Sequence, residues 1–191
     1  MEYLVSKSVR ELDDRAGGVQ RLTIAAMIDL SSTGDAANDM FVAIANIEGS
    51  SHDDTLIGDV AANVLTGGKG RDTLNGGKGK DVFAYRKPNE SPVGAANSDQ
   101  IVGFEPGTAT TSVDKIDLSA IDANSTKGGN QGFAFRGTKP FNGPSQIRLL
   151  KSGANLVIQG NVNASLAADF EIVLKGMASK ASLVTAKDFK L

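Results

Sequence analysis

A single apolar residue recurs every nine positions between residues 49 and 84. This segment divides without insertion into the blocks GSSHDDTLI, GDVAANVLT, GGKGRDTLN and GGKGKDVFA. The eighth residue of each block is apolar, and in chain order these residues are Leu56, Leu65, Leu74 and Phe83. One apolar side chain per nine residues cannot form a core alone, whereas stacked blocks bring these side chains into continuous rows. The pattern therefore predicts a solenoid of short strands and tight turns.

Regular alternation of apolar and polar residues returns after the polar loop YRKPNESPVGAANS. It predicts short strands between turn signals at DQIVGF (99–104), DKIDLSAID (114–122), GFAFRG (132–137), SQIRLLKSGANLVIQG (145–160) and ADFEIVLKG (168–176). Residues 151–155 read as the tip of a hairpin. We expect this second half to be a small antiparallel β-sandwich packed against the end of the solenoid.

The N-terminal residues give a weaker pattern. Residues 3–15 carry apolar residues at helical spacing before two glycines, which predicts a short helix. Residues 21–30 and 40–47 read as strands. The predicted fold class is therefore all-β: an N-terminal cap over 1–29, a parallel β-roll over 30–86 and a β-sandwich region over 87–191.

Composition narrows the chemistry that the chain can perform. Its 191 residues include 22 glycines and no cysteine, so disulfides and thiolate metal sites are excluded. Any metal must bind through oxygen, which favours calcium or magnesium. The formal net charge is −2 and the basic residues are scattered, which argues against nucleic-acid binding. The first 15 residues have no apolar run, so they predict neither a Sec-type signal peptide nor a membrane span.

The block turns have the composition of a cation site. Glycine at positions one, two and four allows sharp turns with positive φ, which lets successive carbonyls point into one space. Calcium prefers six to eight oxygens, more than one turn supplies, so we expect it to lie between stacked turns. The candidate ligands are the turn glycines and the sixth-position residues, namely Gly67, Gly68, Gly70, Gly76, Gly77, Gly79, Asp54, Asn63, Asp72 and Asp81.

If two blocks make one coil, turns on the same side are two blocks apart. Asp54 then pairs with Asp72, and Asn63 pairs with Asp81. The second site should be weaker, because Asn63 is uncharged and its block lacks the turn glycines; Asp59 is an additional candidate ligand there.

The G-G-x-G-x-D-x-U-x blocks resemble the RTX repeats of proteins exported by type I secretion. The likeness extends over about residues 30–191, where the predicted strands are similar to the C-terminal domain of serralysin-type metalloproteases and to the R-modules of mannuronan C5-epimerases. It implies a right-handed, calcium-loaded parallel β-roll, with Asp99, Asp114 and Asp117 also near calcium. The ending KDFKL resembles the C-terminal signal that the exporter reads, although Lys190 interrupts its hydrophobic run.

The sequence lacks the residues that the common hydrolytic mechanisms require. The chain has one histidine, His52, whereas the zinc protease motif H-E-x-x-H needs two, and no G-x-S-x-G elbow occurs. The leading hypothesis is a secreted, non-catalytic calcium-binding module that folds outside the cell after type I export. The alternatives are a module that binds an acidic polysaccharide such as alginate and a detached C-terminal domain of a metalloprotease. The expected polysaccharide contacts are Lys69, Arg71, Lys78, Lys80 and Arg86.

Overall fold

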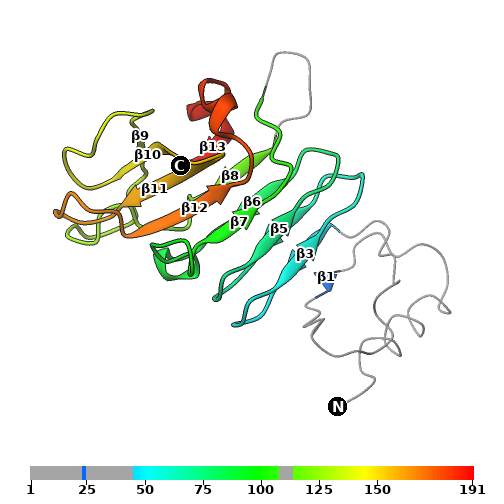
Figure 1. Cartoon of the computed structure of the whole chain (residues 1–191). Helices are drawn as coiled ribbons and strands as arrows, with labels where there is room; N and C mark the ends of the chain where they lie inside the picture. Colours follow the sequence, from blue (N-terminus) through cyan, green and yellow to red (C-terminus); the bar gives the residue numbers. More distant parts are fainter. Residues whose placement is uncertain (1–22, 25–44, 108–113) are drawn as a thin grey trace, which may run out of the picture.

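Two facing β-sheets run through the protein (Figure 1). The computed structural model describes residues 23–24, 45–107 and 114–191, so the predicted helix at 3–15 lies outside the described residues. From residue 46 onward the chain alternates between the two sheets, one short strand at a time. These strands are β2 (Asn46–Glu48), β3 (Thr55–Ile57), β4 (Val64–Thr66), β5 (Thr73–Asn75), β6 (Val82–Ala84), β7 (Asp99–Ile101) and β8 (Lys115–Asp117).

Parallel pairing within each sheet follows the nine-residue period. In one sheet Leu65 of β4 pairs with Phe83 of β6, and in the other Leu56 of β3 pairs with Leu74 of β5. Each partner lies two blocks along the chain, so two nonapeptides make one coil, as the sequence predicts. The sheet orders are β1-β2-β4-β6-β8-β13 and β3-β5-β7-β12-β11-β10-β9.

The C-terminal strands extend these same two sheets. The antiparallel strands β10 (Gln146–Ser152), β11 (Asn155–Asn161) and β12 (Phe170–Leu174) join the seven-stranded sheet through the parallel pair of β12 with β7. The sheets end in the short strands β9 (Ala134–Phe135), β13 (Phe189–Lys190) and, at the N-terminal side, β1 (Thr23–Ile24). The predicted all-β fold, a roll that continues into an antiparallel end, is confirmed.

All helices in the described part of the chain are short 3-10 helices. They are η2 (Pro88–Glu90), η3 (Ala178–Leu183) and η4 (Ala186–Asp188). Among the described residues, none of these helices has the length or the apolar character needed to cross a membrane.

The core lies between the two sheets and is one residue wide in the roll. The eighth-position side chains point into it, and the fully buried ones continue into the C-terminal strands. Residues with 0 % exposure include Leu65, Leu74, Phe83, Ile101, Ile116, Ile158 and Ile172. Burial of each such side chain stabilises the fold by about 1.5–3 kcal/mol relative to leaving it exposed to water. The roll therefore depends on a thin core, and its polar turns lie just outside that core.

Candidate metal centre

Two sixth-position residues, Asp54 and Asp72, and Asp99 stack on one side of the roll and form what we call the Asp54 row. The backbone N–H of Asp54 donates to Oδ1 of Asp72 at 2.8 Å, and that of Asp72 donates to Oδ1 of Asp99 at 2.9 Å. The structure therefore brings together Asp54 and Asp72, which the period places on one side, and adds Asp99 from beyond the repeats. Residues 85–93 lie between the last block and the Asp99 turn, so the row bridges an interruption in the repeat.

The opposite side carries an equivalent Asn63 row. The backbone N–H of Asn63 donates to Oδ1 of Asp81 at 2.9 Å, and that of Asp81 donates to Oδ1 of Asp114 at 3.1 Å. Asp114 directly precedes β8 and occupies the place in its coil that Asp81 occupies before β6. Both rows thus consist of three residues held in register by the same backbone-to-side-chain bond.

The third and fourth blocks, GGKGRDTLN and GGKGKDVFA, have all three turn glycines, and we call them the clean blocks. Their glycine turns lie directly against the carbonyls of the turn two blocks earlier on the same side of the roll. Gly68 and Gly70 have φ of 102° and 120°, which L side chains rarely adopt. A Cβ on Gly68 would also meet the carbonyl oxygen of Ser50, and one on Gly70 would meet that of His52. Glycine at these positions therefore lets two turns approach closely with carbonyl oxygens facing the space between them.

The same arrangement occurs along the Asn63 row. Gly77 and Gly79 have φ of 87° and 138°, and their Cα atoms face the carbonyl oxygens of Asp59 and Ala61. The first glycine of each clean block lies close to a carboxylate oxygen of the same block. A Cβ on Gly67 would meet Oδ2 of Asp72, and one on Gly76 would meet Oδ2 of Asp81. All six predicted turn glycines thus face oxygen atoms.

Three buried carboxylate oxygens in these rows have no hydrogen-bond partner. They are the Oδ2 atoms of Asp72, Asp81 and Asp99, and all three residues are 0 % exposed. Burial raises the pKa of Asp72 to about 6 and that of Asp99 to about 8, and it also raises the pKa of Asp81. Burying an ionised oxygen without a partner is unfavourable, and a cation bound beside it would offset that cost.

The first residue of each row is satisfied by its own turn instead. Oδ2 of Asp54 accepts from the backbone N–H of Ser50 at 2.6 Å and from the Ser50 hydroxyl at 2.9 Å. Oδ1 of Asn63 accepts from the backbone N–H of Asp59 at 2.9 Å. In the first two blocks, which lack most of the turn glycines, local hydrogen bonds therefore hold the side chains of Asp54 and Asn63. In the two clean blocks, Oδ2 of Asp72 and of Asp81 faces the glycine turn without a hydrogen-bond partner.

Tyr85 is a buried polar residue beside the Asp54 row that sequence reasoning missed. Its side chain is buried, and its hydroxyl interacts with the carboxylate of Asp99. Burial raises the pKa of Tyr85 well above its usual value, and the neighbouring Asp99 raises it further. Tyr85 follows the last block directly, and nothing in the local sequence distinguishes it from an ordinary apolar core residue.

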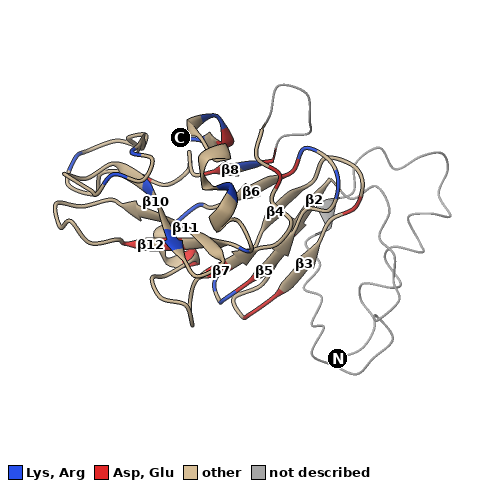
Figure 2. Cartoon of the chain, turned by 45° about the horizontal axis from the view of Figure 1, so that its top comes forward, with Lys and Arg blue, Asp and Glu red and all other residues tan. Residues whose placement is uncertain are grey.

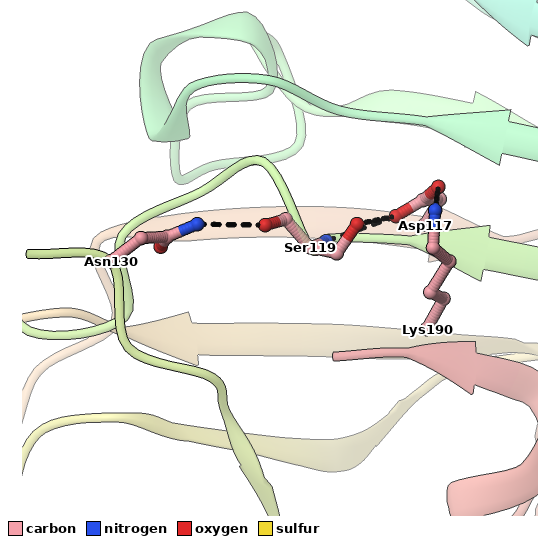
Figure 3. Close-up of polar contacts among 4 residues, drawn as sticks. All are labelled: Asp117, Ser119, Asn130 and Lys190. Carbon is pink, nitrogen blue, oxygen red and sulfur yellow. Dashed lines mark hydrogen bonds and ion pairs between the residues drawn. The ribbon is translucent and has the colours of Figure 1, made fainter.

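The structure places Asp117 in a different environment (Figure 3). Its Oδ1 accepts from the Ser119 hydroxyl at 2.6 Å, and its Oδ2 forms an ion pair with Lys190 at 2.8 Å. Burial acts to raise the pKa of Asp117, but the hydrogen bonds from Lys190 and Ser119 outweigh it and lower the pKa. Its side chain thus joins β8 to the C-terminus and bonds to Ser119 and Lys190, which belong to neither row. Asn130 extends the network by donating to the Ser119 carbonyl at 3.0 Å.

The donor set fits a hard cation with many ligands. Within the described residues no three His, Cys, Asp or Glu side chains gather where they could hold a metal. Each gap between turns offers two side chains at most, so backbone carbonyls must supply the remaining oxygens. Calcium accepts carboxylate and carbonyl oxygens in irregular geometry, whereas magnesium requires a near-ideal octahedron and zinc prefers nitrogen and sulfur.

Comparison with known proteins identifies the repeat. The family model of the RTX calcium-binding nonapeptide repeat matches residues 48–83 in four copies. The fold resembles the solution structure of the AlgE6R2 subunit from the Azotobacter vinelandii mannuronan C5-epimerase, with 27% identity and a TM-score of 0.52, covering 75% of this chain and 79% of that chain. The AlgE6R3 subunit of that epimerase is also similar, with 23% identity and a TM-score of 0.46, covering 74% of this chain and 79% of that chain. A search of curated proteins found no match.

Proposed function

We propose that this chain, whose four RTX repeats are calcium-binding, is a non-catalytic module that uses calcium to switch on its own folding after export from the cell. The observation that carries the proposal is the set of three fully buried aspartate oxygens without hydrogen-bond partners. In the absence of a cation these carboxylates oppose folding. In its presence they become ligands that only the folded chain assembles.

The physical basis is the balance between a thin core and buried charge. A roll with one apolar residue per block gains little to offset chain entropy, and repulsion within the aspartate rows reduces that gain further. Calcium that binds only the folded form stabilises it by mass action, by about 2.7 kcal/mol per site at a hundredfold excess over Kd. Extracellular calcium modules have Kd values of roughly 0.1–1 mM, so millimolar calcium outside the cell is sufficient for this switch.

Export before folding is the role that such a switch would serve. A chain that stays unfolded at low intracellular calcium can be threaded through a type I apparatus, which reads the C-terminus. It would then fold outside the cell, where calcium is abundant. We therefore propose that the protein is secreted and acts outside the cell. The proposed calcium ligands are Asp54, Asn63, Asp72, Asp81, Asp99 and Asp114.

Isothermal titration with calcium tests the ligand assignment. We expect wild-type protein to bind at least two ions, and we expect Asp72→Asn and Asp81→Asn each to lose one site or weaken it at least tenfold. Asp122→Asn is the matched control, because Oδ1 of Asp122 accepts from the Asn124 and Gln131 backbones and an amide oxygen can do the same. Equal affinity in the two row variants and in wild type would contradict the assignment.

A second candidate function is binding of an acidic polysaccharide. Two observations favour it: the likeness to a subunit of a mannuronan C5-epimerase and the segregation of charge along the chain (Figure 2). Residues 45–114 carry ten acidic and six basic side chains, whereas residues 115–191 carry ten basic and five acidic ones. A basic half suits a polyuronate, which carries one carboxylate per sugar.

The structure modifies the contacts expected for this function. Lys69, Lys78 and Lys80 are exposed in the turns and remain candidates, although they lie in the more acidic part of the chain, 45–114. Arg86 forms an ion pair with Glu48 at 2.6 Å and is therefore already engaged. Binding to alginate but not to a neutral glucan, at a strength that falls with salt, is the expected result. Equal retention on both polymers would argue against this second function.

A further inference from the structure

The last seven residues, 185–191, form a closed structural unit that we call the C-terminal latch. It comprises η4 and β13, and β13 adds a final parallel strand to the six-stranded sheet beside β8. The backbone N–H of Leu118 donates to the carbonyl of Lys190 at 2.8 Å. Phe189 is only 6 % exposed and its ring lies 5.4 Å from that of Phe135. In the folded protein the latch is thus built into the sheet and core.

Asp188 holds the latch in place from within. This residue is 0 % exposed. Its Oδ2 accepts from the backbone N–H of Thr185 at 2.7 Å and from the Thr185 hydroxyl at 3.3 Å, which closes the turn of η4. Its Oδ1 accepts from the backbone N–H of Gly107 at 2.8 Å, 81 residues away in sequence. Asp188 is therefore the point where the latch joins a distant segment.

That distant segment is also bonded to the Asn63 row. The backbone N–H of Glu105 donates to Oδ2 of Asp114 at 2.9 Å, and the Asp114 N–H donates to the Glu105 carbonyl at 3.0 Å. Residues 105–107 are thus held by Asp114 at one end and by Asp188 at the other. A second link runs from Nζ of Lys115 to the carbonyl of Lys187 at 2.8 Å. These two links add to the pairing of β13 with β8, the strand that begins directly after Asp114.

We infer that calcium binding at the Asn63 row and docking of the C-terminal latch are coupled through Asp188, so that the C-terminus is hidden in the calcium-bound protein and accessible in the calcium-free chain. This inference rests on the proposed function. A cation beside Asp81 and Asp114 fixes the position of Asp114, and hence of the 105–107 bridge that Asp188 must meet. Coupling between two binding events is reciprocal, so the docked latch in turn strengthens calcium binding at this row.

The consequence concerns any partner that reads the C-terminus as an extended peptide. Phe189 and Leu191 are the apolar residues that such a partner would contact, and in the folded protein both pack against the core. A receptor for this peptide, such as an export apparatus, competes directly with calcium-driven folding. Calcium therefore acts as a release signal as well as a folding signal.

Carboxypeptidase digestion, followed by mass spectrometry, measures whether the latch is docked. We expect wild-type protein to lose its last residues at least tenfold more slowly in 10 mM calcium than in chelator. Asp188→Asn should lose them quickly in both conditions, because its single amide oxygen can accept from only one of the two backbone N–H groups, those of Gly107 and Thr185, that the carboxylate binds. Lys187→Ala is the matched control in the same segment, since its exposed side chain makes none of these bonds, and it should behave as wild type.

A calcium titration of the same proteins separates the possible failures. Asp188→Asn should need several-fold more calcium for half-saturation at one class of site. Wild-type protein that binds no calcium would overturn the proposed function itself. Wild-type protein that binds calcium, together with an Asp188→Asn variant that is equally protected and has an unchanged titration midpoint, would overturn the coupling alone. If Asp188→Asn does not fold in calcium, Thr185→Ala provides the same test: faster digestion with a raised calcium midpoint supports the coupling, and no change in the midpoint refutes it.

Discussion

Replacement of Asp72 by asparagine is expected to stabilise the protein in chelator and to reduce the stabilisation that calcium adds. The side chain is 0 % exposed, and its Oδ1 accepts from the backbone N–H of Asp54 at 2.8 Å while its Oδ2 has no hydrogen-bond partner. Asparagine has nearly the same shape and retains an oxygen that can accept the Asp54 bond. The variant therefore removes the buried charge and largely preserves the packing.

The magnitude follows from the pKa of Asp72. Burial raises this pKa from 3.8 to about 6, and each unit corresponds to about 1.4 kcal/mol. At neutral pH the ionised carboxylate therefore opposes folding by at most about 3 kcal/mol in the absence of metal. Asparagine removes this penalty, so we expect the variant to melt several degrees higher than wild type in chelator, at about 2–4 °C per kcal/mol for a chain of this size.

Calcium narrows this difference, because it stabilises wild type more than the variant. A site with a Kd of about 0.1–1 mM contributes roughly 1.4–2.7 kcal/mol in 10 mM calcium, and the variant loses one charged ligand of that site. Thermal melts at pH 7 in chelator and in 10 mM calcium measure both effects, and Asp122→Asn serves as the control. The reasoning is refuted if Asp72→Asn melts lower than wild type in chelator, or if it gains as much from calcium as wild type does.

Three further predictions concern other parts of the structure. In chelator, stability should fall as pH rises from about 4 through 8, because burial raises the pKa of Asp114 to about 6 and that of Asp99 to about 8, so the folded form holds protons that the unfolded chain releases. Melts across this range in 10 mM calcium should lack that fall, and a parallel fall would contradict the ligand roles. Gly70→Ala should destabilise the calcium-bound form by more than about 1 kcal/mol, since φ is 120° and a Cβ would meet a carbonyl oxygen; a melt unchanged within error would show that the turns are less tightly stacked. Lys190→Ala should lower stability by less than about 1 kcal/mol, because the Lys190 side chain is 64 % exposed, and a larger loss in a urea melt would assign its pair with Asp117 a structural role.

The nine-residue period predicted the part of the fold that repeats. Because side chains eighteen residues apart stack in a two-block coil, the positions of Leu65 over Phe83 and of Asp54 beside Asp72 follow from the sequence alone. The same reasoning extends to the alternation of the strands between two sheets. Local periodicity is therefore sufficient where each coil contacts only its neighbours.

Contacts between segments that share no period could not be predicted in this way. The bond from Gly107 to Asp188 and the pair of Asp117 with Lys190 join residues more than seventy positions apart. Asp117 is the last residue of β8, yet its carboxylate pairs with Lys190 of β13, which is 73 residues away in sequence. Such contacts depend on how the two halves pack, which no local pattern in the chain records.

The buried carboxylates make one measurement the most direct test of calcium-dependent folding. Far-UV circular dichroism follows the chain from chelator through a calcium titration to about 10 mM, with magnesium as the control for hard-cation selectivity. At 37 °C we predict a spectrum with little β-structure in chelator, because the metal-free fold is weakly stable and melts at a lower temperature. The spectrum should convert cooperatively to β-structure with calcium and not with magnesium. A spectrum that is fully folded in chelator and unchanged by calcium would contradict the proposed folding switch.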